Sequence, residues 1–69
     1  MVNRIPERLK QMRKERKLSR YMVAKGIGKT LTTYGRWEDG EQVPNADHVI
    51  LLCKFFNCTS DFLLGLIDE

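Results

Sequence analysis

The sequence lacks the features that mark membrane, secreted and metal-binding proteins. Its longest unbroken apolar run, residues 49–53, has five residues, whereas a membrane-spanning helix needs about 20. The N-terminus shows no apolar stretch behind its charges, so it does not have the form of a signal peptide. Two cysteines, Cys53 and Cys58, are too few for a disulfide scaffold, and a single histidine cannot complete a Cys/His zinc site with them. We therefore expect a cytoplasmic protein with two free thiols and with no metal, cofactor or membrane contact.

The length leaves room for one domain. A chain of 69 residues, with 42% hydrophobic and 30% charged residues, has the composition of a small globular protein. We expect a single domain over residues 1–69, with an economical core, because so short a chain buries only about 60% of its unfolded surface.

Charge is divided unevenly along the chain. Residues 1–36 hold eleven Lys and Arg against two acids, a net +9, and residues 37–69 hold one Lys against seven acids, a net −6. A basic half indicates a polyanionic partner such as nucleic acid, and the acidic half indicates a part that does not touch it. Solvated helix faces of uneven sign would give the same composition, so charge alone does not decide the function.

The spacing of apolar residues predicts helices and no strand. Four of the expected helices follow a residue suited to capping a helix N-terminus, namely Ser19, Thr30, Asn45 and Thr59. The connections between them are short, as in compact helical domains. We predict an all-α five-helix bundle with helices at about residues 6–16, 20–26, 31–38, 46–57 and 60–65.

Residues 19–40 form the most informative segment. A capped helix with the small residue Ala24 is followed by a turn at Gly28 and by a second capped helix, which is the layout of a helix-turn-helix. In that motif the second helix enters the major groove of DNA. Tyr34 and Trp37, spaced i, i+3, are expected to face the core, and the alternative is that they stack on nucleic-acid bases. The outward residues of this helix are expected to be Leu31, Thr32, Thr33, Gly35 and Arg36.

No catalytic constellation accompanies this motif. His48 lies beside Asp47, but no Ser or Cys nucleophile is placed to complete a catalytic set. The segment from Gly26 to Thr30 lacks the spacing and the preceding strand of a phosphate-binding loop. We therefore do not expect an enzyme.

Nearly the whole chain, roughly residues 5–66, resembles the phage-repressor and Cro-like (xenobiotic-response-element type) helix-turn-helix domains. The likeness includes Glu7-Arg8-Leu9-Lys10, Leu18-Ser19, Trp37-Glu38-Asp39-Gly40, the loop at Pro44, and the tail from Asn57 to Gly65. The resemblance implies a lambda-repressor-like fold and sequence-specific binding of double-stranded DNA. It further implies a transcriptional regulator, most simply a repressor that binds a palindromic operator as a homodimer.

The resemblance also assigns residues to the DNA interface. Base edges would be read by the third helix and the residue before it, through Thr30, Leu31, Thr32, Thr33 and Arg36. Phosphates would be held near the start of the second helix and in the turn, by Ser19, Arg20 and Lys29. Arg20 stands where many relatives have Gln, which favours a phosphate contact over a base contact at this position.

Two further positions follow from the same resemblance. Arg13 and Glu38 match a pair that joins the first helix to the end of the recognition helix, so we expect a structural ion pair between them. Lys17 replaces the Gly that usually ends the first helix, so we expect a left-handed, strained backbone there.

The C-terminal part is richer in apolar residues than one small core requires. We expect Phe62, Leu66 and Ile67 to form a homodimer interface, and the alternative is that the tail folds back onto the first helix. A second hypothesis for function remains beside DNA regulation. The chain would then be an antitoxin-like or adaptor module that binds a partner protein through its acidic, apolar C-terminal half.

Overall fold

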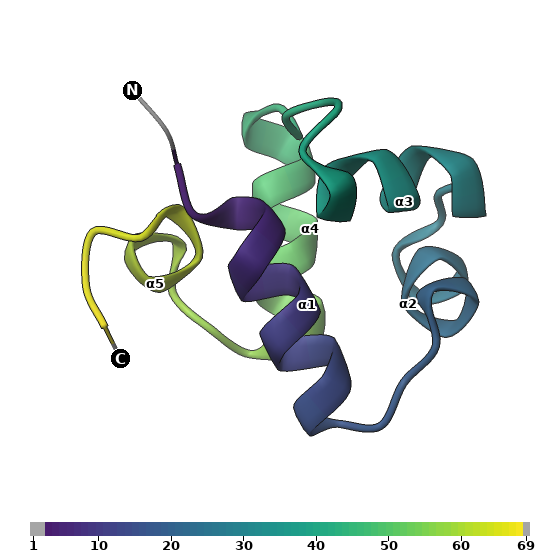
Figure 1. The fold of residues 1–69 in the computed structure, drawn as a ribbon, viewed down its shortest axis with the longest axis horizontal. Coiled ribbons are helices and arrows are strands. Elements are labelled where there is room, and N and C mark those ends of the chain that lie inside the picture. Colours follow the sequence, from purple (N-terminus) through teal and green to yellow (C-terminus); the bar gives the residue numbers. More distant parts are fainter. Residues whose placement is uncertain (1–2, 69) are drawn as a thin grey trace.

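The structure, a computed structural model, describes residues 3–68, which form five helices and no strand (Figure 1). The expected all-α, five-helix architecture is confirmed. Each helix begins and ends within one residue of its predicted bounds, because the turn and capping residues that delimit it are readable in the sequence. The helices are α1 (Ile5–Glu15), α2 (Arg20–Ile27), α3 (Leu31–Asp39), α4 (Ala46–Phe56) and α5 (Ser60–Leu64).

Side-chain caps define where the helices begin. The residues before α2, α3, α4 and α5 each accept a hydrogen bond from the backbone N–H three residues later, at 2.9–3.2 Å. These acceptors are Ser19, Thr30, Asn45 and Thr59. Such caps satisfy backbone donors that have no partner within the helix. The first helix begins differently, with Asn3 Oδ1 accepting from the Ile5 N–H at 3.0 Å and Pro6 in the first turn.

The core lies where α1, α4 and α5 meet the α2–α3 pair. Figure 1 shows α5 on one side of α1 and the α2–α3 pair on the other, with α4 running behind α1. The residues that fill the centre are almost fully buried and include Leu9, Val23, Tyr34, Trp37, Leu52, Phe56 and Leu63. Tyr34 and Trp37 pack edge to face, with ring centroids 6.2 Å apart. Both aromatic residues are therefore core residues, as predicted.

The helix α2 lies close against α4 at Gly26. A Cβ atom built at this glycine would overlap the ring of Phe55, so the aromatic ring rests directly on the α2 backbone. Burial of Val23 and Ala24 on the same helix completes this contact. The orientation of the helix-turn-helix relative to the rest of the fold is thus set by packing as well as by the turn.

Lys17 ends α1 in the left-handed region, at φ 57°. The amide of the next residue, Leu18, donates to the carbonyl of Arg13 at 3.0 Å, which is the hydrogen bond of a Schellman motif. Gly28 and Gly40 end α2 and α3 with similar φ values of 76° and 78°, but as glycines they have no Cβ to crowd the carbonyl. The predicted strain at Lys17 is present.

We predict that Lys17→Gly raises the free energy of unfolding by about 1 kcal/mol, because it removes this left-handed strain from an exposed position. Urea denaturation would show a higher midpoint with an unchanged m-value. Lys17→Ala is the control, since it removes the charge and keeps the Cβ atom. If the alanine variant is stabilised as much as the glycine variant, the effect is due to charge and not to the backbone.

Candidate nucleic-acid interface

The outer face of α3 is open to solvent. Thr32 and Arg36 are exposed and Leu31 is 49% exposed, although it is a large apolar residue. Beside them lies a shallow surface recess lined by Arg20, Leu31, Thr32, Gly35, Arg36, Asp39 and Glu41. An apolar side chain and an arginine that both project from one helix face are suited to contact base edges in a major groove.

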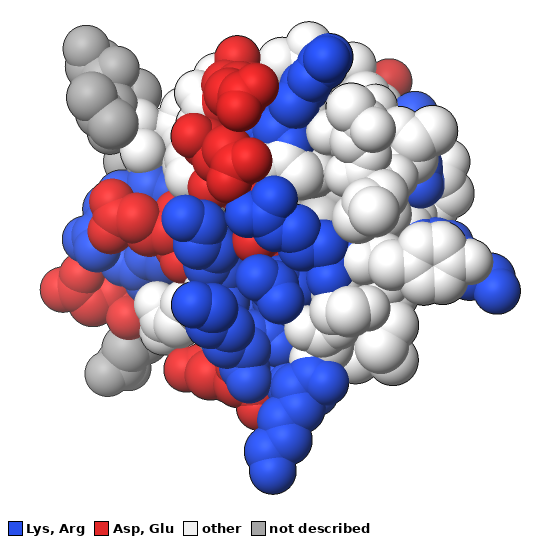
Figure 2. Space-filling view, turned by 45° about the vertical axis from the view of Figure 1, so that its right-hand side comes forward, with Lys and Arg blue, Asp and Glu red and all other residues white. Residues whose placement is uncertain are grey.

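Basic side chains gather beside this face. Figure 2, turned so that the α2–α3 side comes forward, shows a continuous group of Lys and Arg with an uncharged surface next to it and acidic groups above. The eleven basic residues of residues 1–36 are therefore partly brought together in space by the fold. A cationic group of this kind beside an exposed helix is the electrostatic footprint of a nucleic-acid-binding surface.

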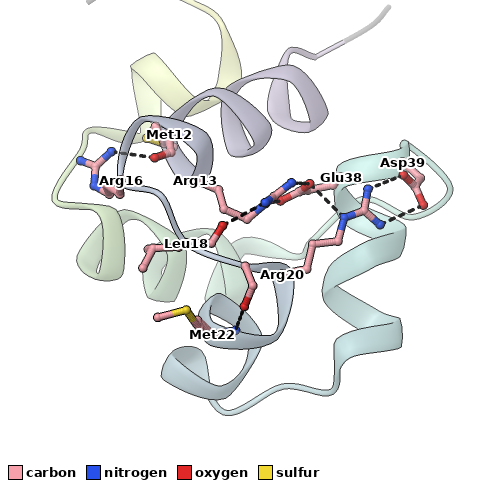
Figure 3. A network of polar contacts seen from close by, with 9 residues as sticks. Met12, Arg13, Arg16, Leu18, Arg20, Met22, Glu38 and Asp39 are labelled. Atoms are coloured by element: carbon pink, nitrogen blue, oxygen red, sulfur yellow. Dashed lines mark hydrogen bonds and ion pairs between the residues drawn. The ribbon is translucent and has the colours of Figure 1, made fainter.

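Glu38, at the C-terminal end of α3, is a completely buried acid, and its side chain has no exposure to solvent. Arg13 of α1 holds it with two hydrogen bonds, from Nε to Oε2 at 2.6 Å and from Nη2 to Oε1 at 3.0 Å (Figure 3). The third nitrogen of Arg13 donates to the Leu18 carbonyl at 3.0 Å. The expected Arg13–Glu38 ion pair is therefore present in the structure, in the two-pronged geometry that arginine and carboxylate favour.

Arg20, the first residue of α2, adds a second cation to the same carboxylate. Its Nε lies 3.2 Å from Glu38 Oε1, and its Nη2 donates to Asp39 Oδ1 at 2.8 Å (Figure 3). We call Arg13, Arg20, Glu38 and Asp39 the carboxylate clamp. It joins α1, α2 and α3 through charged hydrogen bonds, so α3 is fixed to both preceding helices.

Gly35 lies beneath the Arg20 guanidinium. Gly35 lines the recess on the outer face, as expected, but the Arg20 side chain covers it, so the residue is buried, and a Cβ at this position would lie 3.2 Å from Arg20 Nη1. The glycine lies one helical turn before Asp39, so its missing side chain leaves space for Arg20 to reach that acid. This explains a glycine inside a helix, where it costs about 1 kcal/mol relative to alanine.

The clamp changes the ionisation of its members. Burial is the largest single influence on Glu38 and by itself would raise its pKa, but the hydrogen bonds from Arg13 and Tyr34 and the charges of Arg13 and Arg20 together lower the pKa below its ordinary value of 4.5. The hydrogen bond from Arg20 likewise lowers the pKa of Asp39. Conversely, the hydrogen bond to Glu38 raises the pKa of Arg13. All four groups are charged at neutral pH.

The predicted base-reading residues occupy different environments. Leu31, Thr32 and Arg36 project from the outer face of α3 and are exposed. Thr30 is exposed too, but its hydroxyl caps α3 by accepting from the Thr33 N–H at 3.2 Å. Thr30 also donates to the hydroxyl of the half-buried Thr33 at 3.0 Å. The two threonines thus bond to each other at the start of the helix.

The predicted phosphate contacts are similarly divided. The Ser19 hydroxyl caps α2 by accepting from the Met22 N–H at 3.1 Å. An anion at the start of this helix would therefore bind the backbone N–H groups of the first turn and not the hydroxyl. Lys29 lies in the turn between α2 and α3 and is half-buried. Arg20 is one-third exposed and already bonded to two carboxylates. Its charge is therefore largely neutralised within the protein.

The residues predicted for a dimer interface lie at and after α5. Phe62 is partly buried, and the Arg8 guanidinium lies 4.1 Å from the centre of its ring. Leu66 and Ile67 are 72% and 42% exposed. The tail therefore presents apolar side chains to solvent, while Phe62 contributes mainly to the packing of α5 on α1.

Sequence reasoning missed the burial of Arg8, which is 4% exposed, and the role of Arg20 in the clamp. A signal existed for the second. Glu38 follows the inward-facing Trp37, and an acid at such a position requires cationic partners to be buried. Arg20 and Gly35, however, are far apart in sequence, and nothing in their spacing indicates that they touch.

The described residues form neither a membrane-spanning helix nor a cluster of metal ligands. Over residues 3–68 no helix has the length and apolar character required to cross a membrane. Within the same residues, no three His, Cys, Asp or Glu side chains gather in a way that could hold a metal ion.

A capped helix pair with an exposed second helix and a basic surround defines the class of helix-turn-helix proteins. The helix-turn-helix family matches residues 9–63, and the chain belongs to this family, in its phage-repressor and Cro-like branch. The HTH-type transcriptional regulator YobD of Bacillus subtilis is 33% identical over 91% of this chain and 56% of its own length. Repressor protein C2 of Salmonella phage P22 is 31% identical over 84% of this chain and 27% of its own length. The chain thus spans about half of the first relative and less of the second.

Solved structures agree with this assignment. The P22 c2 repressor, crystallised in complex with a synthetic operator, superposes with a TM-score of 0.82 and 30% identity, over 87% of this chain and 91% of that one. A transcriptional regulator from Listeria innocua gives a TM-score of 0.88 and 25% identity, over 100% of this chain and 64% of that one. These relatives are transcriptional regulators and not enzymes, which confirms the expectation for this chain.

We predict that Glu38→Gln destabilises the fold by about 3 kcal/mol at neutral pH, because it leaves the largely buried Arg13 without a counter-charge. The pKa of Glu38 is lower in the folded protein than in the unfolded chain. The ionised carboxylate therefore stabilises the fold fully above the unfolded pKa of 4.5, and this stabilisation is lost as the pH falls through the folded pKa. In urea denaturation at a series of pH values, the difference in free energy of unfolding between the wild type and the variant should therefore become smaller below about pH 4.5.

The exposed acid Glu41 provides the control, because Glu41→Gln should have little effect at any pH. A gap between the wild type and Glu38→Gln that stays constant from neutral to acidic pH would mean that the carboxylate is not held in charged form by the clamp.

Proposed function

We propose that the chain is a sequence-specific DNA-binding regulator of transcription that places α3 in the major groove of its operator. The observation that carries this proposal is the outer face of α3, where Leu31, Thr32 and Arg36 project into solvent from a helix that the carboxylate clamp fixes in place. The operator complex of the P22 c2 repressor supports the same use of this fold. Thr30 and Thr33 complete the reading surface at the start of the helix.

Arg36 is the principal reader in this proposal. Within the described residues it forms no ion pair, in contrast to Arg13 and Arg20, so its guanidinium is available to a ligand. Arginine pairs in two-pronged fashion with guanine, and a good pair of this kind contributes about 1–3 kcal/mol of discrimination. The neighbouring Leu31 and the methyl group of Thr32 supply apolar contacts suited to thymine methyl groups.

Lys29 and the backbone N–H groups after Ser19 hold phosphates beside the reading helix. Phosphate contacts contribute affinity without sequence preference and make binding fall steeply with salt. Arg20 contributes through the position of α3 and through neutralising Asp39, so that this acid does not repel the DNA backbone.

The regulator acts as a homodimer and represses by occluding a promoter. Leu66 and Ile67 are exposed apolar residues next to α5, and together with Phe62 they provide a surface that a second copy can cover. A two-fold pair would present two α3 helices about 34 Å apart, which matches successive major grooves of a palindromic site.

We predict that Arg36→Ala and Lys29→Ala weaken DNA binding in different ways. Loss of Arg36 should relax the preference at one base position of each half-site, by about 1–3 kcal/mol. Loss of Lys29 should weaken binding to all DNA sequences nearly equally, and it should reduce the salt dependence of the affinity by about the amount due to one phosphate contact. Affinities measured across duplexes of systematically varied sequence, at two salt concentrations, separate these effects.

Lys54 serves as a matched control, because it is exposed on α4 and belongs to the acidic half of the chain. Lys54→Ala should change neither preference nor salt dependence. If Arg36→Ala keeps the sequence preference of the wild type, α3 does not read DNA through this residue.

A homodimer through the tail would be disrupted by Leu66→Asp, which places a charge in the proposed interface. Sedimentation at micromolar concentration should show a dimer for the wild type and a monomer for this variant. Met22→Asp is the control, since Met22 is 51% exposed and lies on α2, away from the tail. A wild-type protein that sediments as a monomer with and without DNA would contradict the proposed dimer.

A further inference from the structure

The two cysteines of the chain occupy a single structural motif at the end of α4. Asn57 ends the helix in the left-handed region, at φ 55°, and the Cys58 N–H donates to the Cys53 carbonyl at 3.0 Å. This is the long hydrogen bond of a Schellman motif, in which the side chains of the two bonded residues commonly contact each other. In this chain both of those residues are cysteines.

The backbone geometry limits how far apart the two residues can be. Given the 3.0 Å hydrogen bond, standard covalent lengths keep the two Cα atoms within about 6.9 Å. For comparison, the Cα atoms of disulfide-bonded cysteines are usually about 4.4–6.8 Å apart. Burial, and after it the neighbouring Cys53 thiol, raise the pKa of Cys58 to about 11.

The pair is also accessible. Both cysteines are free thiols, both are only partly buried, and both line a surface hollow of about 380 Å³ between α4 and the start of α5. The same hollow is lined by Val49 and Ile50, which give it an apolar wall. A ligand bound to both sulfur atoms would therefore have an apolar surface beside it.

We propose that Cys53 and Cys58 form a chelating dithiol site for a thiophilic ligand that needs two sulfur donors, of the class of monosubstituted trivalent arsenicals. Over residues 3–68 no third metal-ligating side chain joins the pair, and ions such as zinc take four ligands in structural sites. The arsenic atom of an arsenical with one organic group carries two hydroxyl groups that thiols can replace, one for each of the two cysteines. Its organic group lies against Val49 and Ile50.

The binding step is a condensation without redox change. Two As–O bonds of the dihydroxy form break and two As–S bonds form, and each thiol proton leaves with a hydroxide as water. Arsenic remains trivalent throughout, and no oxidant or reductant takes part. The product is a ring that closes the end of α4 onto Cys58, just before the N-cap of α5.

The test uses the reduced chain and phenylarsine oxide, in the presence of excess glutathione to compete for single thiols. The wild type should bind one arsenical per chain and lose both free thiols, and a small-molecule dithiol should reverse the binding. Cys53→Ser and Cys58→Ser should each bind about 10²–10⁴-fold more weakly, because the second bond is then intermolecular. Circular dichroism establishes that the variants remain folded.

A second comparison tests the apolar wall. Ile50→Ser should weaken binding of the phenyl arsenical more than that of the methyl arsenical, since only the larger group reaches along the wall. Binding of two arsenicals per wild-type chain, or single-cysteine variants that bind as tightly as the wild type, would overturn the proposal. Equal losses for the two arsenicals in Ile50→Ser would overturn the placement of the organic group.

Discussion

The fold depends on a buried carboxylate that cannot be left unpaired. Glu38 has no solvent exposure and is bonded to Arg13 on α1 and to Arg20 on α2. An isolated carboxylate in such a place would be prohibitively costly, so the carboxylate can be buried only when the three helices are correctly arranged. The clamp thereby links helix packing to the angle at which α3 presents its outer face. A hydrophobic contact would give similar stability with less directional control, because apolar packing is not directional.

The arginines of the basic half consequently have two kinds of role. Arg13 and Arg20 are bonded to carboxylates, and Arg8 lies over the ring of Phe62 in the interior. Arg36 and the lysines remain at the surface, where they can meet a polyanion. Net charge therefore overstates the cationic surface available to DNA. The glycine at position 35 belongs to this division, since the space above it is occupied by Arg20.

The local features of the fold could be predicted from the sequence because their causes are local. Ser19, Thr30, Asn45 and Thr59 cap the helices that follow them, and Gly28 ends α2, so the helix bounds followed from neighbouring residues. The contact of Arg20 with Glu38, Asp39 and Gly35 depends on the crossing angle of α2 and α3. That angle arises from packing against α1 and α4, which involves residues far apart in the sequence, so it could not be predicted from local sequence patterns. The contacts of the α3 surface with DNA stay predictions for the same reason.

The proposed function requires that α3 read DNA sequence as one of a symmetric pair. In vitro selection of the wild-type protein from random duplex DNA, at near-physiological salt, tests it most directly. We expect enrichment of a two-fold symmetric motif whose half-sites are about 10 base pairs apart, centre to centre. Salt-sensitive binding without enrichment of any sequence would rule out reading by α3, because the phosphate contacts would then act without the reading helix.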